Sequence, residues 1–242
     1  AEAQALDMAG KYAEGGTVYV TLEPCAHHGK TPPCIDALIT ARVARMVVAV
    51  KDPDPRVNGR GLKKARAAGI DIEFGVESEA AVAVLGGFLR RIEHGKPSVW
   101  LKTAASLDGG IALYDGQKRW LTGSPMRYFV HELRSRCDAL LTGVGTILAD
   151  DPELTCRAPS PVSDSPPVFI LDSRLRTPLS SRILDDRQRM VTLFCTESAP
   201  KDRLMAIKKT GATVTTLTTD SQGQLDLQAV LSHLGTIGIN TI

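Results

Sequence analysis

Two cysteines in the first part of the chain, Cys25 and Cys34, have the residue type and spacing of metal ligands. A proline directly precedes each of them, and eight residues with the sequence Ala-His-His-Gly-Lys-Thr-Pro-Pro separate them. Thiolates are soft ligands of the kind that zinc prefers in proteins. Because two thiolates do not complete a zinc site, the pair predicts a metal centre for which a third ligand and a proton-transferring group must be found.

The flanking sequence predicts which elements carry the two thiols. Residues 17–22 are rich in β-branched and aromatic side chains and predict a strand that ends just before Cys25. Thr31 is expected to cap the following helix, and the two prolines after it fit the first helical turn, so Cys34 falls near the helix N-terminus. The helix dipole and the free N–H groups there are expected to favour a thiolate.

A carboxylate near the start of the chain is the candidate proton carrier. Glu2 lies in the first turn of a helix predicted for residues 2–14. Zinc deaminases of nucleobases carry His-x-Glu and, downstream, Pro-Cys-x-x-Cys, in which the His and both Cys bind zinc and the Glu transfers protons. Ala1-Glu2 matches the end of the first motif, so we expect the His one residue before Ala1 in a longer chain. The eight residues between Cys25 and Cys34 depart from the usual two.

The rest of the first part alternates helices with strands. The predicted helices span residues 33–41, 62–68 and about 77–91, and the predicted strands span 46–50 and 70–74. The uninterrupted apolar run of residues 46–50 is typical of a buried parallel strand. This alternation predicts a layered α/β domain over residues 1–94, with zinc where helix N-termini meet strand ends. The loop 51–61 follows a strand, and its basic side chains and glycine N–H groups are candidates for contacting a phosphate.

Composition narrows the classes of function. The chain has 242 residues, of which 43% are hydrophobic and 23% are charged, as in an ordinary globular protein. It contains no run of about 18 apolar residues, so we expect no membrane partner. A net charge of +2 offers no large positive surface for nucleic acid. The low net charge therefore favours a small-molecule substrate. The five cysteines form no evenly spaced disulfide framework, so we expect a cytoplasmic protein.

The hydrophobic pattern restarts after residues 94–97, which predict a linker to a second α/β domain. We expect β structure at 98–105, a helix from Ser124, its cap, to about 136, and a buried strand at 139–142. Further strands are predicted at 168–171, 190–195 and 212–217, and further helices at 200–209 and 225–234. Gly143-Val144-Gly145-Thr146 follows a predicted strand, which by itself is only a weak indication of phosphate binding.

Longer motifs in both parts resemble one known family. Leu22-Glu23-Pro24 and the insert between the cysteines closely resemble the deaminase half of the bifunctional riboflavin-biosynthesis deaminase/reductase. The segments 101–109, 120–122 and 148–157 occur in the order seen in the reductase half, whose fold is similar to dihydrofolate reductase. The resemblance covers essentially the whole chain. It implies a cytidine-deaminase-like three-layer domain over residues 1–94 and a dihydrofolate-reductase-like α/β domain over 97–242, with one end of each family domain lying outside this sequence.

The resemblance also implies substrate, cofactors and site residues. The substrate is 2,5-diamino-6-ribosylamino-4(3H)-pyrimidinone 5′-phosphate, which loses ammonia at a zinc site and then has its ribosyl group reduced to ribityl by NADPH. The implied zinc ligands are Cys25 and Cys34, and Glu2 is the catalytic acid and base. The implied NADPH-binding residues are Ala104, Trp120, Thr146, Asp150 and Ser173. The implied substrate-binding residues are Lys30, Lys118, Arg134, Leu154 and Arg157. Association with a second copy is left open.

Other interpretations of the same residues remain. Cys25 and Cys34 also suit a buried apolar pair or a structural zinc site with His27 or His28, although such a site is saturated by four protein ligands. A zinc deaminase of nucleobases or tRNA with a noncatalytic C-terminal domain is a second enzymatic alternative. Without the resemblance, Arg134 is explained by an ion pair on a helix face and Trp120 by core packing.

Overall fold

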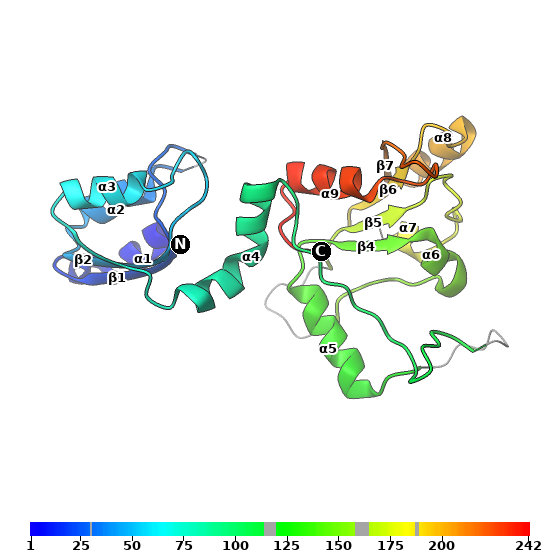
Figure 1. Cartoon of the computed structure of the whole chain (residues 1–242), viewed down its shortest axis with the longest axis horizontal. Coiled ribbons are helices and arrows are strands. Elements are labelled where there is room, and N and C mark those ends of the chain that lie inside the picture. The colour runs from blue at the N-terminus through cyan, green and yellow to red at the C-terminus, as the bar shows by residue number, and fades with distance from the viewer. Residues whose placement is uncertain (30, 114–119, 158–164, 187–188) are drawn as a thin grey trace. The chain divides into compact units, whose positions relative to one another are not determined.

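The computed structural model describes residues 1–29, 31–113, 120–157, 165–186 and 189–242. Two compact units divide the chain, Ala1–His94 and Gly95–Ile242 (Figure 1). Each unit has its own parallel sheet and its own core, so each is described by itself. No helix in the described ranges is long and apolar enough to span a bilayer.

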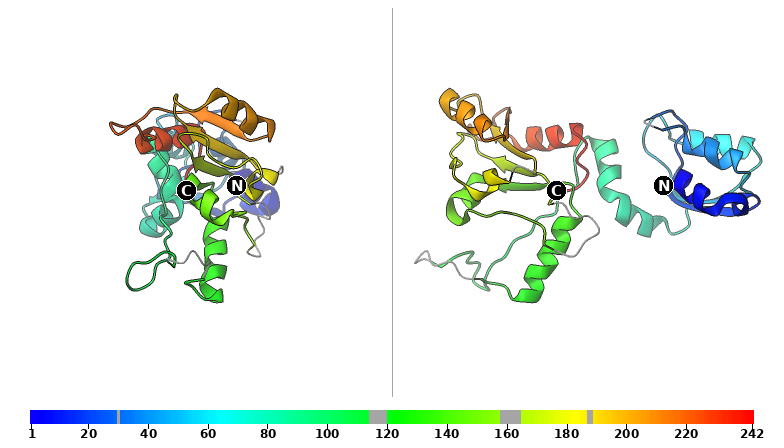
Figure 2. Two further views of the ribbon diagram at one scale, coloured as in Figure 1. Left: turned by 90° about the vertical axis from the view of Figure 1, so that its right-hand side faces the viewer. Right: turned by 180° about the vertical axis from the view of Figure 1, so that it is seen from behind.

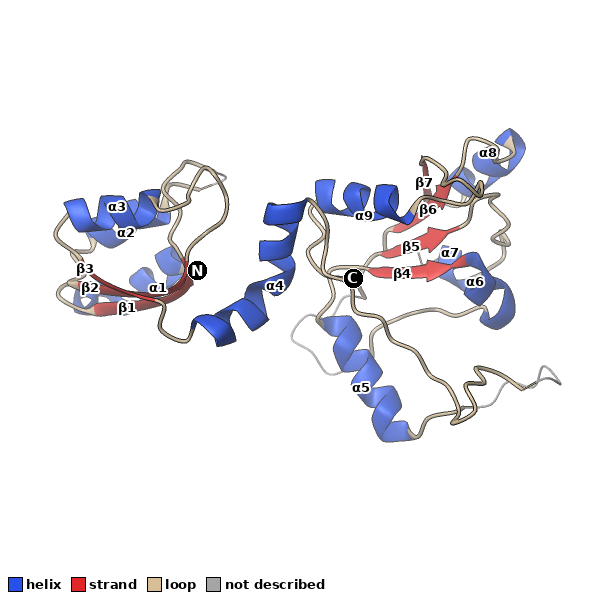
Figure 3. Ribbon diagram, in the orientation of Figure 1, coloured by secondary structure: helices blue, strands red, loops and turns tan. Residues whose placement is uncertain are grey.

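A three-stranded parallel sheet forms the centre of the first unit. Its strands are β1 (Thr17–Leu22), β2 (Arg45–Val50) and β3 (Asp71–Phe74), in the order β1-β2-β3 (Figure 3). β2 pairs with both neighbours, and four consecutive residues of this central strand are buried. This burial on both faces explains the apolar run in the sequence, because a parallel strand covered on both sides does not alternate apolar with polar residues.

Helices supply the other layers of the first unit. They are α1 (Glu2–Ala9), the 3₁₀ helix η1 (Gly10–Ala13), α2 (Cys34–Thr40), α3 (Arg60–Ala67) and α4 (Ser78–His94). α2 and α3 bury residues three positions apart, Ile35 with Leu38 and Leu62 with Ala65, against Met46 and Val48 of β2. This spacing places both members of each pair on one helix face. α4 contacts β1 and β2.

Two local predictions for the first unit were wrong. The helix predicted for residues 2–14 changes to a 3₁₀ turn at Gly10, whose φ of +53° lies outside the right-handed helical region. The helix after Thr31 begins at Cys34, Pro33 is its N-cap, and no side chain caps it. Helical backbone angles are unfavourable for a residue that precedes proline. The Pro-Pro pair therefore moves the N-cap two residues along the chain, from the predicted Thr31 to Pro33.

The second unit contains a four-stranded parallel sheet. Its strands are β4 (Leu140–Gly143), β5 (Val168–Leu171), β6 (Val191–Cys195) and β7 (Thr213–Thr216), ordered β4-β5-β6-β7. The helices are α5 (Ser124–Ser135), α6 (Val144–Asp150), α7 (Arg182–Asp185), α8 (Lys201–Lys209) and α9 (Leu227–Thr236). The sequence did not predict α7, and α5 has Gly123 rather than Ser124 at its N-cap.

Helices lie on both faces of this sheet (Figure 1; Figure 2), and alternate residues of β5 and β6 enter the two cores there. On one face Ile170 and Leu193 pack with residues of α6, α7 and α8. On the other face Phe169 and Phe194 stack with ring centroids 5.4 Å apart and pack with Val230 and Leu234 of α9. The second unit therefore has helices on both sides of a parallel sheet, which places the carboxyl ends of its strands at one edge.

The start of the second unit is attached to its last residues. Ser98 forms a parallel bridge with Thr241, and the Trp100 N–H donates to the Ile242 carbonyl oxygen at 2.7 Å. This pairing replaces the longer β segment predicted for 98–105. A Cβ atom at Gly235 would collide with the Gly95 carbonyl oxygen, so the chain crosses α9 at a point where only glycine fits.

Candidate active sites

The structure brings Glu2, Cys25 and Cys34 together in the first unit. The Cys34 N–H donates to the Cys25 Sγ at 3.2 Å. This hydrogen bond joins the segment that follows β1 to the first residue of α2. Glu2, in the first turn of α1, lies close enough to the Cys34 thiol to raise its pKa. Three segments that are separate in sequence therefore bring two thiols and one carboxylate into the same neighbourhood.

The electrostatics of this cluster favour a bound cation. Burial contributes most to a raised pKa of the Cys34 thiol, and together with the neighbouring Cys25 thiol and the charge of Glu2 it brings this pKa to about 12. The prediction that the helix N-terminus would favour a thiolate was therefore wrong, because burial and the neighbouring acidic groups outweigh it. A divalent cation reverses this balance, since it attracts thiolates and carboxylate alike.

The donor set fits zinc. Two neighbouring cysteines supply soft ligands, and a carboxylate near Cys34 is suited to exchange protons with a water in the same site. Within the described ranges no cluster of three or more metal-binding side chains occurs, so the cysteine pair needs at least one further protein donor for a tetrahedral site.

Glu23, a buried glutamate for which the sequence predicted no role, holds residues 23–25 in place. These residues follow β1 and are called the Cys25 turn. Glu23 is only 2% exposed, and its carboxylate accepts the N–H groups of Gly59 at 2.8 Å and Leu62 at 3.1 Å. Gly61 lies so close to the turn that a Cβ atom there would collide with the Pro24 carbonyl oxygen. The start of α3 is thereby fixed against the residues that carry the first thiol.

Carboxylates organise part of the loop 51–61. Asp52 is buried, which raises the pKa of its carboxyl, and it accepts the Asp54 N–H at 2.9 Å. Hydrogen bonds from Arg56 lower the pKa of Asp54 to about 2. The Gly59 N–H is taken by Glu23, so this amide does not serve the phosphate contact predicted here, and the Arg56 guanidinium is already paired with Asp54. Lys30 lies outside the described residues.

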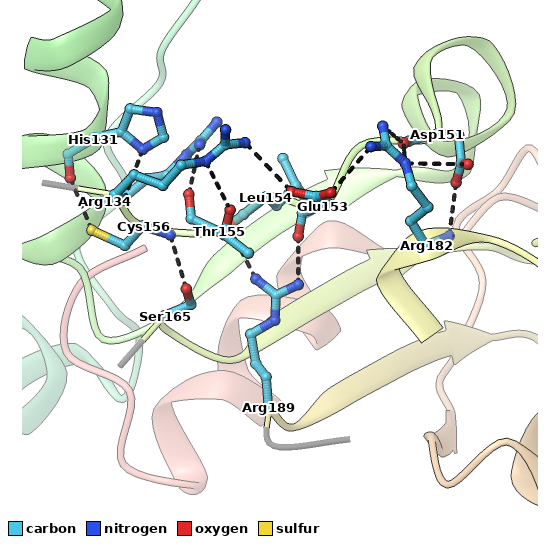
Figure 4. Close-up of polar contacts among 11 residues, drawn as sticks. His131, Arg134, Asp151, Glu153, Leu154, Thr155, Cys156, Ser165, Arg182 and Arg189 are labelled. Atoms are coloured by element: carbon cyan, nitrogen blue, oxygen red, sulfur yellow. Dashed lines mark hydrogen bonds and ion pairs between the residues drawn. The ribbon is translucent and has the colours of Figure 1, made fainter. Parts of the chain in front are cut away.

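In the second unit, Arg134 lies beside the segment 151–157 (Figure 4), close enough to Arg157 of that segment to interact with its charge. Arg134 of α5 donates to the Thr155 carbonyl oxygen at 3.1 Å. Arg157 donates from Nε to the Thr155 Oγ1 at 3.3 Å, and its backbone N–H donates to Nδ1 of His131 at 3.1 Å. Leu154 lies in the same segment with a φ of +53°. Lys118 lies outside the described residues.

This arrangement concentrates positive charge. Burial lowers the pKa of His131, and the charges of Arg134 and Arg157 lower it further. Burial and the charge of Arg157 also lower the pKa of Arg134. Basic groups that disfavour one another's protonation attract an anion, because an anion relieves their repulsion. The carboxylate of Glu153 partly neutralises this positive charge, since it forms an ion pair with Arg157 at 3.4 Å.

Two further arginines, which the sequence analysis did not single out, fix the backbone of this segment. Arg189 donates to the Leu154 carbonyl oxygen at 3.0 Å, and Arg182 donates to the Asp151 carbonyl oxygen at 2.9 Å (Figure 4). Arg182 also donates to Glu153 Oε1 at 3.1 Å. Their partners lie about 30 residues away or more, so no local sequence pattern indicates them.

A pocket of about 660 Å³ opens at the carboxyl ends of β4, β5 and β6. Of the five residues predicted to bind NADPH, Ser173 lines it, and Thr146 directly follows the lining residue Gly145. Asp150 lies one helical turn after Thr146, on the same face of α6. Ala104 lies in a loop and does not line the pocket. Trp120 is 80% exposed with the Arg127 guanidinium 4.8 Å from its ring centre, so core packing does not explain it. Hydroxyl and guanidinium groups in a cavity of this size fit a phosphorylated nucleotide.

Comparison with known proteins identifies both units. Residues 1–50 match the cytidine and deoxycytidylate deaminase zinc-binding region, and residues 97–242 match the RibD C-terminal domain. The chain is 41% identical to the riboflavin biosynthesis protein RibD of Escherichia coli K12, over 100% of the chain and 67% of that protein. It is 38% identical to the protein of the same name from Bacillus amyloliquefaciens, over 100% of the chain and 64% of that protein.

Solved structures agree with this result. RibD of Acinetobacter baumannii superposes with a TM-score of 0.87 at 36% identity, over 100% of this chain and 65% of that one. A Thermotoga maritima deaminase/reductase superposes with a TM-score of 0.81 at 32% identity, over 99% and 64%. The chain spans about two thirds of the length of these relatives, or slightly less. The predicted fold class, a cytidine-deaminase-like domain followed by a reductase-like α/β domain, is confirmed, and the chain belongs to the RibD family of riboflavin biosynthesis proteins.

Proposed function

We propose that the first unit deaminates a phosphorylated diaminopyrimidine with zinc and that the second unit reduces the ribosyl group of the product with NADPH. The observation that carries the proposal is the convergence of Glu2, Cys25 and Cys34. The zinc-binding family implies zinc for the first unit, and the reductase family implies NADPH for the second. The Thermotoga maritima relative is described as a diaminohydroxyphosphoribosylaminopyrimidine deaminase and 5-amino-6-(5-phosphoribosylamino)uracil reductase.

In the proposed deamination, Cys25 and Cys34 hold the metal and Glu2 moves the protons. Bound zinc supplies a Lewis acid that lowers the pKa of a water in the site to near neutrality. The Glu2 carboxylate accepts a proton from that water and delivers one to the departing amine. Its proximity to Cys34 supports this role, because the carboxylate lies near a proposed metal ligand. The product is the corresponding uracil derivative plus ammonia.

In the proposed reduction, the second unit binds the two reactants in different places. NADPH supplies the hydride that converts ribosyl to ribityl at C1′. The pocket at the ends of β4, β5 and β6 holds the nucleotide, and Arg134 and Arg157 hold the substrate phosphate beside Leu154. Planar guanidinium groups suit this task because they present paired donors to a phosphate. The five free thiols suit a reducing compartment, and we therefore assign the protein to the cytoplasm.

Ammonia release and zinc content, measured on the full-length protein, test the deaminase assignment. Glu2→Gln should abolish ammonia release while zinc stays bound, because it removes the proton carrier and leaves both thiols. Glu79→Gln removes a carboxylate from an exposed position on α4 and should leave both readouts unchanged. Unaltered turnover in Glu2→Gln would exclude Glu2 as the acid and base.

Nucleotide binding separates this proposal from a nucleobase or tRNA deaminase with a noncatalytic C-terminal domain. A reductase unit binds NADPH, which such a deaminase does not need. Failure of the wild-type protein to bind NADPH would therefore contradict the second activity and leave the first one standing.

A further inference from the structure

The pocket at the strand ends contains two arginines that the predicted NADPH site does not include. Arg174 and Arg176 line it together with Ser173, Thr196 and Ser198. Both arginines lie in the turn that follows β5, and both are exposed, whereas Leu175 between them is fully buried. The burial of Leu175 anchors the turn in the core, and the arginine on each side of it lines the pocket.

Buried hydrogen bonds hold the backbone of this turn rigid. Asp172 is fully buried, and its carboxylate accepts the N–H groups of Arg176 at 2.9 Å and Thr177 at 2.7 Å. Arg203 of α8 donates to the carbonyl oxygens of Leu175 at 2.9 Å and Thr177 at 2.6 Å. Arg174 and Arg176 are therefore presented by a preorganised turn, which reduces the entropic cost of binding a ligand.

The charge in the pocket is unbalanced. Within the described part of the chain, neither the Arg174 nor the Arg176 guanidinium forms an ion pair. Among the described lining residues the one carboxylate is that of Asp220, and its Oδ1 already accepts the N–H groups of Gln222 and Gln224, each at 2.9 Å. Two guanidinium groups beside the hydroxyls of Ser173 and Ser198 match the chemistry of a phosphate monoester.

We propose that Arg174 and Arg176 bind the 2′-phosphate of NADPH and make the second unit select NADPH over NADH. The proposal rests on the proposed reductase function and names the residues that set its cofactor specificity. NADPH and NADH differ only in this phosphate, so selection requires groups that contact it. Parallel α/β sheets bind dinucleotides at the carboxyl ends of their strands, and an arginine beyond a strand end is a general means of accepting a 2′-phosphate. The substrate phosphate is assigned to different residues, Arg134 and Arg157.

Dissociation constants for NADPH and NADH, measured by titration calorimetry on the whole chain, test the proposal. Arg174→Ala and Arg176→Ala should each weaken NADPH binding about tenfold, a loss expected for one charge-assisted contact, and leave NADH binding within about twofold. Arg174→Lys should retain part of the affinity, because the charge remains while the paired donors are lost. Lys209→Ala removes an exposed charge at the far end of α8 and should change neither constant.

Salt supplies an independent readout. Raising the ionic strength should weaken NADPH binding by the wild-type protein more than NADH binding, and the difference should shrink in both alanine variants. Wild-type preference for NADPH that survives both substitutions would overturn the specificity proposal and leave the reductase function intact. An equal loss of NADH and NADPH affinity would also overturn it. Wild-type protein that binds neither nucleotide would contradict both the reductase function and the specificity that depends on it.

Discussion

Replacing Glu23 with glutamine should weaken the contact between the Cys25 turn and the start of α3. The buried carboxylate of Glu23 accepts two backbone N–H groups, from Gly59 at 2.8 Å and from Leu62 at 3.1 Å. A glutamine side chain can accept only one of them, since its amide nitrogen is a donor and would face the other N–H. One lost charge-assisted hydrogen bond and one buried amide without a partner together cost about 2–4 kcal/mol.

Backbone hydrogen exchange at residues 59–62 measures this cost where it arises. A loss of about 2–4 kcal/mol corresponds to exchange that is about 30- to 700-fold faster, provided that these amides exchange through a local opening that recloses faster than exchange occurs. Tryptophan fluorescence does not follow the first unit, because Trp100 and Trp120 both lie in the second. Glu79→Gln, an exposed change of the same type, should alter exchange at residues 59–62 by less than about fivefold.

Gly61→Ala perturbs the same contact from the other side. The added methyl group would meet the Pro24 carbonyl oxygen, so α3 must move away from the turn, and zinc retention should fall in both variants. Unchanged exchange at residues 59–62 in Glu23→Gln would refute the view that this carboxylate holds the turn. An unaltered melting temperature for Gly61→Ala would refute the close approach of α3.

Three further changes test the sites themselves. Cys34→Ser should lower zinc content at least tenfold, because a hard hydroxyl replaces a soft thiolate, and should leave NADPH affinity unchanged. Equal zinc content in the wild-type protein and this variant would exclude Cys34 as a ligand. Arg157→Ala should raise the KM for the phosphorylated substrate about tenfold, whereas Arg136→Ala, an exposed change, should not; an unaltered KM would remove Arg157 from the phosphate site. Because burial and neighbouring arginines lower the pKa of His131, the unfolded chain binds that proton first. The stability of the second unit should therefore fall as pH drops below 6.5, and His131→Gln, which keeps an acceptor for Arg157, should reduce this dependence in urea unfolding measured across pH.

Much of the fold could be predicted because its causes are local. The apolar runs of β2 and β5 identify buried parallel strands, and the turn residues between them fix where helices fit. The proximity of Glu2, Cys25 and Cys34 was also predicted. A metal centre needs its ligands close together in space, however far apart they lie in the sequence. Predictions became wrong where a local rule competed with burial. Cys34 is the clearest case, because its position at a helix N-terminus suggests a lowered pKa, while its burial among acidic groups raises it.

Residues that act over long sequence separations could not be found in this way. Glu23 is 36 and 39 residues from its partners, and Arg189 is 35 residues from Leu154. Their hydrogen bonds depend on how the elements pack, and neither residue stands in a periodic pattern. Arg174 and Arg176 were missed for a related reason. They flank a buried leucine in a turn, and only the pocket around them distinguishes them from ordinary surface arginines.

The pairing of residues 98–100 with 240–242 has a consequence for how the protein is made. Ser98 and Thr241 meet across nearly the whole length of the second unit, and the Gly235 backbone lies against Gly95 at the same junction. Closing a loop of that length costs conformational entropy, so this contact should form late. During translation, the three described strands of the first unit are made before the second unit begins, whereas residues 98–100 must wait for residues 240–242. Nascent chains that stop short of α9 should accordingly display a folded first unit followed by a segment that proteases still cut.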